Sequence, residues 1–204
     1  YRSDYASLSR EEARKLLSNR IALLHRLGCN TIIFQVRAEG DAFYKSTHEP
    51  WSKYLTGKQG EAPNPSWDPL GFVIDECHAR GMELHAWVNP YRGAGNAEAY
   101  LAPNHAAKQS PELFIRHGKQ LYMDPGNPQS IRYISTIVRD IVQRYDIDAI
   151  HFDDYFYPYP QAGLEFDDEE SFSRYGLTAG YRPEQKNEWR RENVNRLIYT
   201  IRQT

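Results

Sequence analysis

The chain has 204 residues, which is enough for one ordinary domain with a sizeable hydrophobic core. It carries 25 basic and 27 acidic residues, and this near balance argues against a nucleic-acid partner or an anionic membrane surface. No apolar stretch reaches the length of a transmembrane helix and no low-complexity linker divides the chain, so we expect a single domain over residues 1–204.

Helix, tight turn and strand follow one another three times along the chain. The predicted helices begin at Ser9, Asp68 and Asn127, because these side chains accept hydrogen bonds from the free N–H groups at a helix start. The predicted strands that follow them are Thr31–Val36, Glu83–Val88 and Ile147–Phe152. A last helix is expected from Pro183 to Ile201.

Apolar residues at helical spacing predict which face of each helix is buried. In chain order they are Ala13, Leu16, Leu17, Leu24 and Leu27; Leu70, Val73, Ile74 and Cys77; Ile131, Ile134, Ile141 and Val142; and Trp189, Leu197, Ile198 and Ile201. The two cysteines, Cys29 and Cys77, lack metal-ligand spacing and lie beside apolar residues. We therefore predict buried free thiols rather than a disulfide.

The connections between these elements are unequal in length, and this decides the architecture. Helix-to-strand turns take a few residues, whereas the segments from strand to helix run to about thirty or more. Strands fed by helices in this order pair in parallel through right-handed crossovers. Long loops that all leave the C-terminal strand ends are typical of a TIM-like (β/α)8 barrel, or of an open α/β sheet. An eight-stranded barrel needs about 250 residues, so the chain holds either an open sheet or about half of a larger barrel.

Each predicted strand carries polar side chains at its C-terminal end. They are Gln35, Arg37, Glu39 and Asp41 for the first; His85, Trp87, Asn89, Tyr91 and Arg92 for the second; and His151, Asp153, Asp154, Tyr155 and Tyr157 for the third. Side chains alternate along a strand, so Gln35 and Arg37 are expected to share the inner face. The same holds for His85, Trp87 and Asn89, and for His151 and Asp153. The apolar residues between them are then expected to face the helices.

The end of the third strand is the most informative segment of the chain. A short apolar strand ends in two adjacent carboxylates, Asp153 and Asp154, and continues into four aromatic rings and two prolines up to Pro160. Carboxylates do acid–base or nucleophilic work at the anomeric carbon of a sugar, and aromatic faces stack against the C–H groups of pyranose rings. The other interpretation is a strand-end Asp that caps the next turn beside rings that fill the rim. We favour a sugar-cleaving site, because tandem acids are costly to place beside buried apolar residues.

The arginines and histidines of these strand ends each have two interpretations. Arg37 and Arg92 either clamp a carboxylate or form a structural ion pair under the site. His85 and His151 are acid–base candidates, although a buried histidine bonded to a neighbouring Asp or Asn is the commoner state. The histidines and tandem acids are residue types that zinc accepts, but HxH and HExxH spacings are absent, so we expect no metal and no cofactor.

Other residues of the strand ends are candidates for sugar binding. Asn89 precedes Pro90 and either bonds a sugar hydroxyl or forms an Asx turn. Trp51 and Trp87 are candidate stacking platforms, although Trp87 also suits the interior of a barrel. Fifteen Tyr against eight Phe means that many rings carry a polar group, which suits carbohydrate faces and also protein interfaces. We expect Trp51 and the strand-end residues other than the tandem acids to bind substrate.

Distinctive blocks of sequence accompany these residues. They are Gln35–Ala42, Pro50–Gly57, Glu83–Arg92, His151–Pro158 and Trp189–Asn195. From about Leu16 to its C-terminus the chain resembles the glycosyl-hydrolase-like 10 family of bacterial proteins. The resemblance implies a (β/α)8 barrel that acts on glycans, usually exported and sometimes a lipid-anchored lipoprotein. One branch of the family is associated with peptidoglycan strands stripped of their stem peptides, and the acidic pair that matches Asp153 and Asp154 is the natural catalytic candidate.

The same resemblance sets expectations for what lies outside the chain. A domain of this family normally begins with one strand before Leu16 and continues through four more strands after Ile201. It follows that this chain holds part of the barrel and that a second catalytic carboxylate can lie beyond it. The resemblance also implies a periplasmic, cell-envelope or secreted location. An incomplete barrel exposes open strand edges, which can pair in a homodimer.

Two functions of different classes fit these observations. The first is a glycoside hydrolase acting on a bacterial or dietary polysaccharide, with Asp153 and Asp154 as catalytic carboxylates. The alternative is a non-catalytic glycan-binding module or pseudoenzyme that uses the same aromatic rings and Asn89. A metal-dependent hydrolase is a weaker third hypothesis. Burial of both acids under helices, away from any cleft, would exclude the first function.

Overall fold

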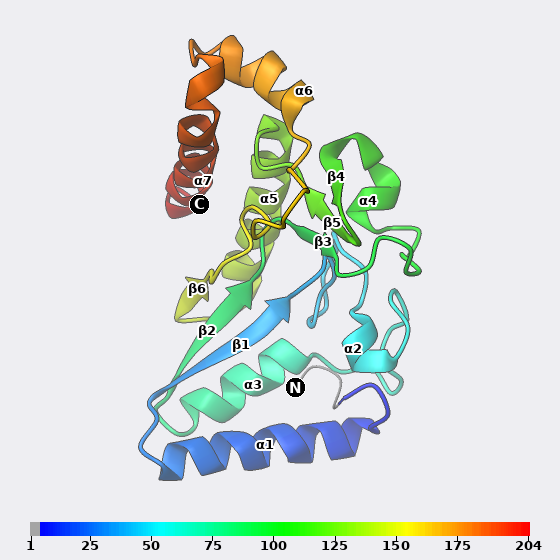
Figure 1. The fold of residues 1–204 in the computed structure, drawn as a ribbon. Coiled ribbons are helices and arrows are strands. Elements are labelled where there is room, and N and C mark those ends of the chain that lie inside the picture. Colours follow the sequence, from blue (N-terminus) through cyan, green and yellow to red (C-terminus); the bar gives the residue numbers. More distant parts are fainter. Residues whose placement is uncertain (1–4) are drawn as a thin grey trace.

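The computed structural model of the chain describes residues 5–204 (Figure 1). Within this range the strands β1 (Thr31–Arg37), β2 (Glu83–Val88) and β6 (Ala149–His151) form a parallel sheet in the order β1-β2-β6. Each strand follows a helix, and these helices are α1 (Arg10–Arg26), α3 (Pro69–His78) and α5 (Pro128–Arg144). The helix α7 (Lys186–Arg202) ends the chain. The predicted α/β class and parallel strand pairing are confirmed.

The main helices begin where their capping residues predict. The hydroxyl of Ser9 accepts the N–H of Glu12 at 3.2 Å, and the Glu12 carboxylate accepts the N–H of Ser9 at 2.9 Å, which is a capping box. The side chains of Asp68 and Asn127 each accept the backbone N–H two residues further on. The last helix differs slightly, since a 3-10 turn at Pro183–Gln185 precedes α7.

Two clusters of buried side chains hold the sheet against its helices. In the larger cluster Leu84 and Ala86 of β2 pack under α1 and α3, which lie together on one face of β1 and β2 (Figure 1). In the smaller cluster Ile134 of α5 packs with Leu197 of α7. On the opposite face of the sheet, Ile33 is 49% exposed. Among the described residues, the helices thus cover one face of the sheet and leave the other accessible.

Burial at the helix ends differs from the sequence prediction. Leu24, Leu27 and Val142 were expected in the buried faces, but they are 37%, 70% and 46% exposed. Both leucines lie at the C-terminal end of α1, where burial depends on what packs against the helix rather than on its period, and Val142 lies at the edge of the apolar stripe of α5. Cys29 is exposed because it lies in the turn between α1 and β1, which corrects the prediction for this thiol, whereas Cys77 is buried and both cysteines are free.

A second, antiparallel sheet lies between β2 and α5, where only a loop was expected. Its strands are β3 (Arg92–Ala94), β4 (Phe114–His117) and β5 (Gln120–Met123), in the order β3-β5-β4. Short helices occupy the other connections, namely α2 (Lys53–Thr56), α4 (Ala106–Gln109) and α6 (Glu169–Ser171). A π-helical turn, Phe172–Leu177, follows α6. Among residues 5–204 there is no helix both long and apolar enough to cross a bilayer.

The strand β6 is shorter than predicted because a side chain replaces part of its backbone pairing. The carboxylate of Asp148 accepts the N–H of Leu84 at 2.7 Å, while the N–H of Asp148 donates to the carbonyl of Leu84 at 2.9 Å. Regular pairing with β2 then covers only Ala149–His151. One residue, Phe152, separates β6 from the tandem acids, which lie at the edge of the sheet where β1 and β2 also end.

Candidate functional site

One side chain from each strand of the parallel sheet, or from the residues just after it, joins a hydrogen-bond chain. Nε2 of Gln35 donates to Oδ1 of Asn89 at 2.6 Å, and Nδ2 of Asn89 donates to Oδ1 of Asp153 at 2.7 Å. Both bonds use the same amide, so its orientation is fixed. Asn89 is 1% exposed, whereas Asp153 is exposed. The C-terminal edge of the sheet therefore presents a carboxylate to solvent in a set orientation.

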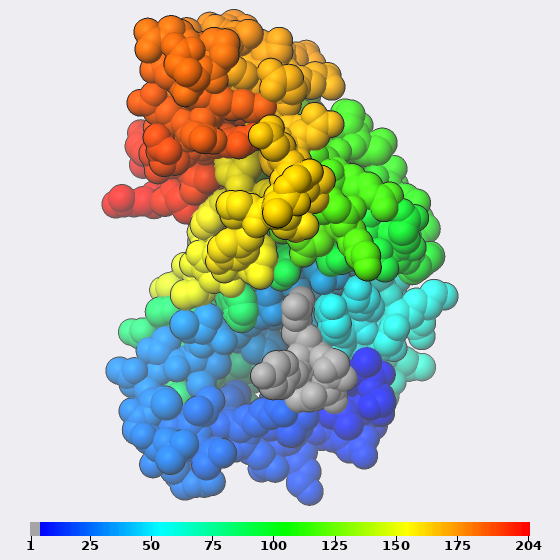
Figure 2. Space-filling view, in the orientation of Figure 1, coloured from blue at the N-terminus to red at the C-terminus, as the bar shows by residue number. Residues whose placement is uncertain are grey.

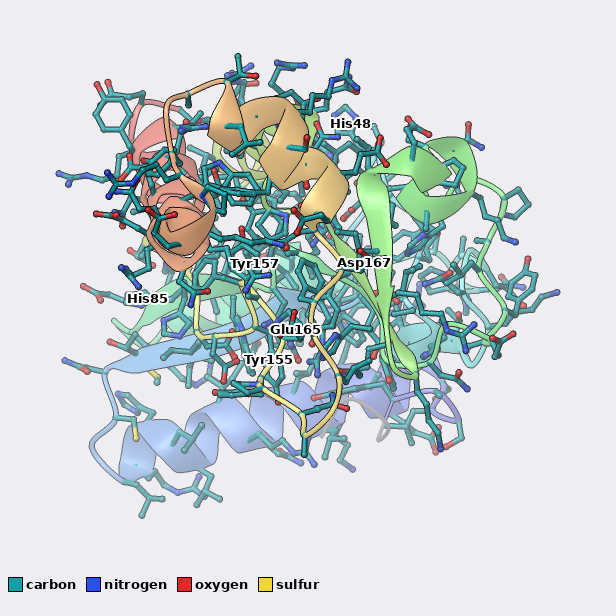
Figure 3. The ribbon with its side chains drawn as sticks, turned by 45° about the horizontal axis from the view of Figure 1, so that its top comes forward. His48, His85, Tyr155, Tyr157, Glu165 and Asp167 are labelled. Atoms are coloured by element: carbon teal, nitrogen blue, oxygen red, sulfur yellow. The ribbon has the colours of Figure 1, made fainter. Side chains whose placement is uncertain are left out.

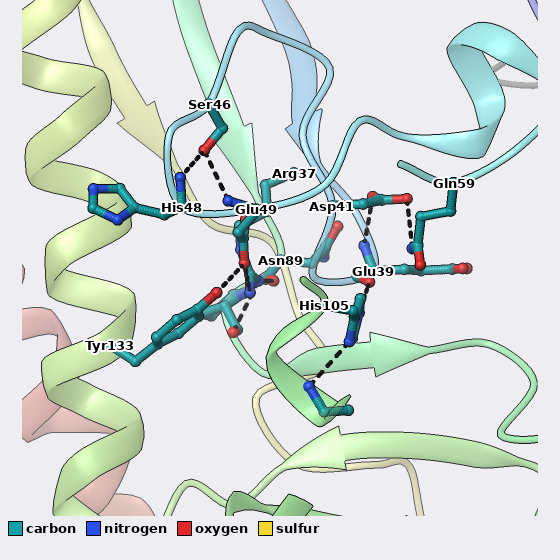
Figure 4. Close-up of polar contacts among 12 residues, drawn as sticks. Arg37, Glu39, Asp41, Ser46, His48, Glu49, Gln59, Asn89, His105 and Tyr133 are labelled. Atoms are coloured by element: carbon teal, nitrogen blue, oxygen red, sulfur yellow. Dashed lines mark hydrogen bonds and ion pairs between the residues drawn. The ribbon is translucent and has the colours of Figure 1, made fainter. Parts of the chain in front are cut away.

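Arg37 is buried beneath this chain and ties it to the loops (Figure 4). Its Nη2 and Nε donate to the carboxylate of Glu49 at 2.7 and 2.9 Å. Its Nη1 donates to the carbonyl oxygens of Asn89 and Pro90 at 2.5 and 3.0 Å. The Tyr133 hydroxyl also donates to Glu49, at 3.1 Å. This geometry favours the structural ion-pair interpretation of Arg37. Its hydrogen bonds also fix the backbone just after β2.

A β-bulge places Arg37 and Gln35 on different faces of the sheet. Gln35 pairs with Trp87, but the register then shifts and Arg37 pairs with Val88. The expected shared face is therefore wrong for this pair, because one extra residue reverses the alternation of side chains. Burial acts to lower the pKa of Arg37, but the charge and hydrogen bonds of Glu49 outweigh burial and raise it above its usual value.

Asp154 is adjacent to Asp153 but has different partners. Its Oδ2 accepts the hydroxyl of Tyr159 at 2.6 Å. The ring of Tyr159 meets that of Tyr155 edge-on, with centroids 5.2 Å apart, and the Arg92 guanidinium lies 4.3 Å from the Tyr155 centroid. Tyr155 itself has a φ of 60°, a left-handed conformation that is uncommon outside glycine. One acid is thus tied to the sheet and the other to an aromatic loop.

Four buried polar atoms of the strand-end residues lack a hydrogen-bond partner in the described part of the chain. They are Oδ1 of Asp154, Nε of Arg92, Nε1 of Trp87 and the hydroxyl of Tyr91. The Trp87 ring lies edge-on to His151, with centroids 6.4 Å apart. Buried polar atoms are nearly always satisfied, so each orphaned atom needs a ligand, a water molecule or another stated reason. Their grouping supports a site for a polar ligand beside the tandem acids.

Glu39 and Asp41 belong to a separate cluster in the loop after β1 (Figure 4). Nζ of Lys53 lies 3.0 Å from Oε2 of Glu39. Asp41 is 1% exposed and accepts the N–H of Glu39 and Nε2 of Gln59, both at 3.3 Å. Burial raises the pKa of Asp41. Within residues 5–204, no hydrogen bond links these two carboxylates to Asp153 or Asp154.

The other predicted site residues have more varied positions. Trp51 packs against the larger core cluster. His85 bonds to a neighbouring glutamate at 3.2 Å and lies apart from Tyr157 (Figure 3). Tyr91 is fully buried in the smaller cluster, and burial raises its pKa. The Tyr157 hydroxyl accepts Nδ2 of Asn193 at 3.2 Å.

Sequence reasoning did not identify Glu49, Tyr133 or Tyr159 as parts of this arrangement. Glu49 lies in a loop with no periodic pattern, so its pairing with Arg37 has no local signal. Tyr159 was visible as part of the aromatic segment after the tandem acids, but its hydrogen bond to Asp154 was not. In the described residues no group of three His, Cys, Asp or Glu side chains is arranged to hold a metal ion.

Comparison with known sequences identifies close relatives. A family model described as "Glycosyl hydrolase-like 10" matches residues 4–204. "Glycosyl hydrolase YngK" of Bacillus subtilis (strain 168) is 43% identical over 197 residues, covering 96% of this chain and 37% of that protein. "Glycosyl hydrolase DigH" of Escherichia coli (strain K12) is 39% identical over 191 residues, covering 89% of this chain and 42% of that protein. The chain thus spans about two fifths of the length of these curated relatives.

Solved structures share the fold at low sequence identity. The α-L-fucosidase isoenzyme 2 from Paenibacillus thiaminolyticus matches with a TM-score of 0.63 and 15% identity, covering 98% of this chain and 28% of that one. A hypothetical protein from Ruminiclostridium thermocellum ATCC 27405 matches with a TM-score of 0.60 and 16% identity, covering 93% of this chain and 86% of that one. These likenesses concern the fold alone. They confirm the prediction that the chain is part of a TIM-like barrel of the kind found in glycosidases.

Proposed function

Because the chain belongs to the glycosyl hydrolase-like 10 family, we propose that it carries the tandem catalytic acids, Asp153 and Asp154, of a glycoside hydrolase. The hydrogen-bond chain from Gln35 through Asn89 to Asp153 is the observation that carries the proposal. It fixes a carboxylate at the C-terminal edge of the parallel sheet, where barrel enzymes place their chemistry. Asp153 is exposed and Asp154 only half-buried, which is not the burial under helices that would exclude this function.

Asp153 acts in this proposal on the positive charge that develops at the anomeric carbon. Its Oδ1 accepts a hydrogen bond from the side-chain Nδ2 of Asn89 at 2.7 Å, and this bond sets the direction of the other oxygen. An ionised carboxylate placed there attacks the carbon, or holds the water or the substrate acetamido group that does so. Asn89 and Gln35 are positioning residues, since they act on the sugar only through Asp153.

Asp154 supplies the proton. The bond between the anomeric carbon and the glycosidic oxygen breaks as that oxygen takes the proton of Asp154. Water then adds its hydroxyl to the anomeric carbon and returns a proton to the carboxylates, so atoms and charge balance over the cycle. The Tyr159 hydroxyl holds Oδ2 of Asp154 at 2.6 Å while this happens.

The separation of the two acting carboxyls sets the stereochemical outcome. About 5 Å leads to retention through direct attack, and about 6.5–9.5 Å leads to inversion by water. Tandem acids also suit a substrate-assisted route, in which the acetamido group of a 2-acetamido sugar attacks and Asp153 polarises it. All three routes use the same two side chains.

The proposed substrate is a bacterial or dietary polysaccharide, with peptidoglycan glycan strands that lack stem peptides as the first candidate. Such strands lie outside the cytoplasm, so the proposal includes a periplasmic, cell-envelope or secreted location. We treat residues 1–204 as one part of a single barrel domain. In the sheet as described, β1 and β6 are the edge strands, and their open edges can pair in a homodimer.

A glycan-binding module without turnover is the second candidate. It is favoured by the Tyr155–Tyr159 ring pair beside Asp154, because ring faces bind sugars whether or not an acid pair cleaves them. The same aromatic rings and the orphaned Nε1 of Trp87 would then bind sugar without cleaving it.

We expect the protein in its natural full length to cut peptidoglycan glycan strands that lack stem peptides. Mass spectrometry should find shorter glycans with new reducing ends, since an acid pair at the sheet edge lowers the barrier to breaking the glycosidic bond. Residues 1–204 alone are assayed in parallel, and retention of both proteins on immobilised strands is measured. Retention without cleavage by either protein would favour the binding module. If both proteins fail to bind the strands and fail to cleave them, both candidates are contradicted.

A further inference from the structure

A groove of about 390 Å³ lies next to the tandem acids, between the segment after β6 and the start of α7. Tyr157 and Glu165, two of its lining residues, are on the segment that joins β6 to α6 (Figure 3). In Figure 2 this segment, coloured yellow, lies at the surface between the small antiparallel sheet in green and the α6–α7 region in orange. The volume is in the range of sites for small ligands, and neither Asp153 nor Asp154 is among the lining residues.

The walls of the groove combine ring faces with an unpaired buried imidazole. Tyr157, Tyr159 and Phe166 line it together with prolines 158 and 160. His117 of β4 also lines it, and this side chain is only 2% exposed. Neither ring nitrogen of His117 has a hydrogen-bond partner in the described part of the chain. A buried imidazole without partners calls for a polar group supplied by a ligand or by water. Rings beside one such polar group suit a sugar residue.

The charges around the groove do not select an anion. Two cations line it, but both are paired with carboxylates: Arg190 with the fully buried Asp168, and Lys186 with Asp168 and Glu169. Arg190 donates to the two oxygens of Asp168 at 2.6 and 2.7 Å, and Nζ of Lys186 lies 2.9 Å from Oδ1. Glu165 and Glu184 add negative charge to the lining. A phosphate or sulfate would therefore find no free positive charge there, which favours an uncharged polar ligand.

Tyr159 connects the groove to the catalytic acid. Its ring is part of the groove wall, and its hydroxyl donates to Oδ2 of Asp154 at 2.6 Å. We propose that the groove is a subsite for a sugar residue next to the bond that is cleaved, and that Tyr159 positions Asp154 when this subsite is filled. The inference rests on the proposed function, because it takes Asp154 as the proton donor. It adds that substrates must extend beyond the cleaved bond toward α7.

The test compares two replacements of Tyr159 with a matched control elsewhere. Tyr159 and Tyr100 are 57% and 58% exposed, so Tyr100→Ala removes an equally exposed ring that does not line the groove. The substrates are glycan strands without stem peptides, separated by length, and kcat and KM are measured for the natural full-length protein. Tyr159→Phe is expected to lower kcat about tenfold at unchanged KM, because it removes only a hydrogen bond to a carboxylate. Tyr159→Ala should in addition raise KM, and only on strands long enough to reach the groove.

A binding measurement separates this inference from the proposed function. Retention on immobilised long strands is compared for Asp153→Asn and for the same variant with Tyr159→Ala or Tyr100→Ala added, since no cleavage is needed. Weaker retention with Tyr159→Ala alone supports the subsite. Retention and KM unaffected by Tyr159→Ala on every strand length would overturn the subsite. Unchanged kcat in Tyr159→Phe would overturn the positioning role. Wild-type protein that never cleaves would overturn that role and the hydrolase proposal together, while retention still decides whether the groove binds sugar.

Discussion

The Asp153→Asn variant is expected to lower kcat on glycan strands by about 10²–10⁴-fold, the usual contribution of a positioned acid–base group. The replacement keeps the size of the side chain and can still accept the hydrogen bond from Nδ2 of Asn89, but it removes the negative charge that acts at the anomeric carbon. Asp153 is exposed, so thermal unfolding should be unchanged. Initial rates of reducing-end formation measure the effect.

A matched control comes from the opposite end of the same strand. The side chain of Asp146 is 95% exposed and lies before β6, so Asp146→Asn makes the same chemical change away from the site. We expect this control to keep the wild-type kcat. Equal rates for both variants and the wild-type protein would remove Asp153 from the mechanism.

The Arg37→Met variant is expected to destabilise the fold by about 3–5 kcal/mol, because it leaves a buried carboxylate without its partner. Arg37 and Glu49 have side chains that are 1% and 0% exposed. Removing the guanidinium also leaves the carbonyl oxygens of Asn89 and Pro90 without the hydrogen bonds that Arg37 donates. For a chain of this size the melting temperature should fall by roughly 6–20 °C. Urea and thermal unfolding followed by circular dichroism measure both quantities.

Two comparisons distinguish the effect of breaking a buried ion pair from that of breaking an exposed one. Arg116 and Glu98 form an ion pair whose side chains are 58% and 71% exposed, so Arg116→Met should cost no more than about 1 kcal/mol. Combining Arg37→Met with Glu49→Leu should recover much of the lost stability, since replacing both charges removes the unpaired carboxylate. A double replacement as unstable as Arg37→Met alone would contradict this explanation.

The alternating pattern of the strands predicted the parallel sheet but not every side-chain direction. Asn89 and Asp153 meet as expected, because their strands end at the same edge and keep their register. The side chain of Arg37 does not lie on the expected face, because the bulge after Gln35 reverses its direction. The residue types at this position give no sign of a bulge. The fold was thus predictable where periodicity is strict and unpredictable where one residue breaks it.

Contacts between residues far apart in the sequence could not be predicted, for a different reason. Tyr133 lies 84 residues from Glu49, and only the three-dimensional path of the chain brings them together. The strands of the antiparallel sheet have three or four residues each, too few to show a pattern. The end of the third strand identified the tandem acids from the sequence, but the hydrogen bond from Tyr159 to Asp154 came only from the structure.

The most direct test of the central claim is the kcat/KM of the Asp153→Asn/Asp154→Asn double variant on glycan strands that lack stem peptides, measured beside both single variants. If the two acids act as one unit on one glycosidic bond, the double variant should lose about as much kcat/KM as the more damaged single variant, because effects within a catalytic unit are not additive. A double variant whose loss is the product of the two single losses would show that the acids act independently. A double variant with wild-type activity would place the chemistry outside these strand ends.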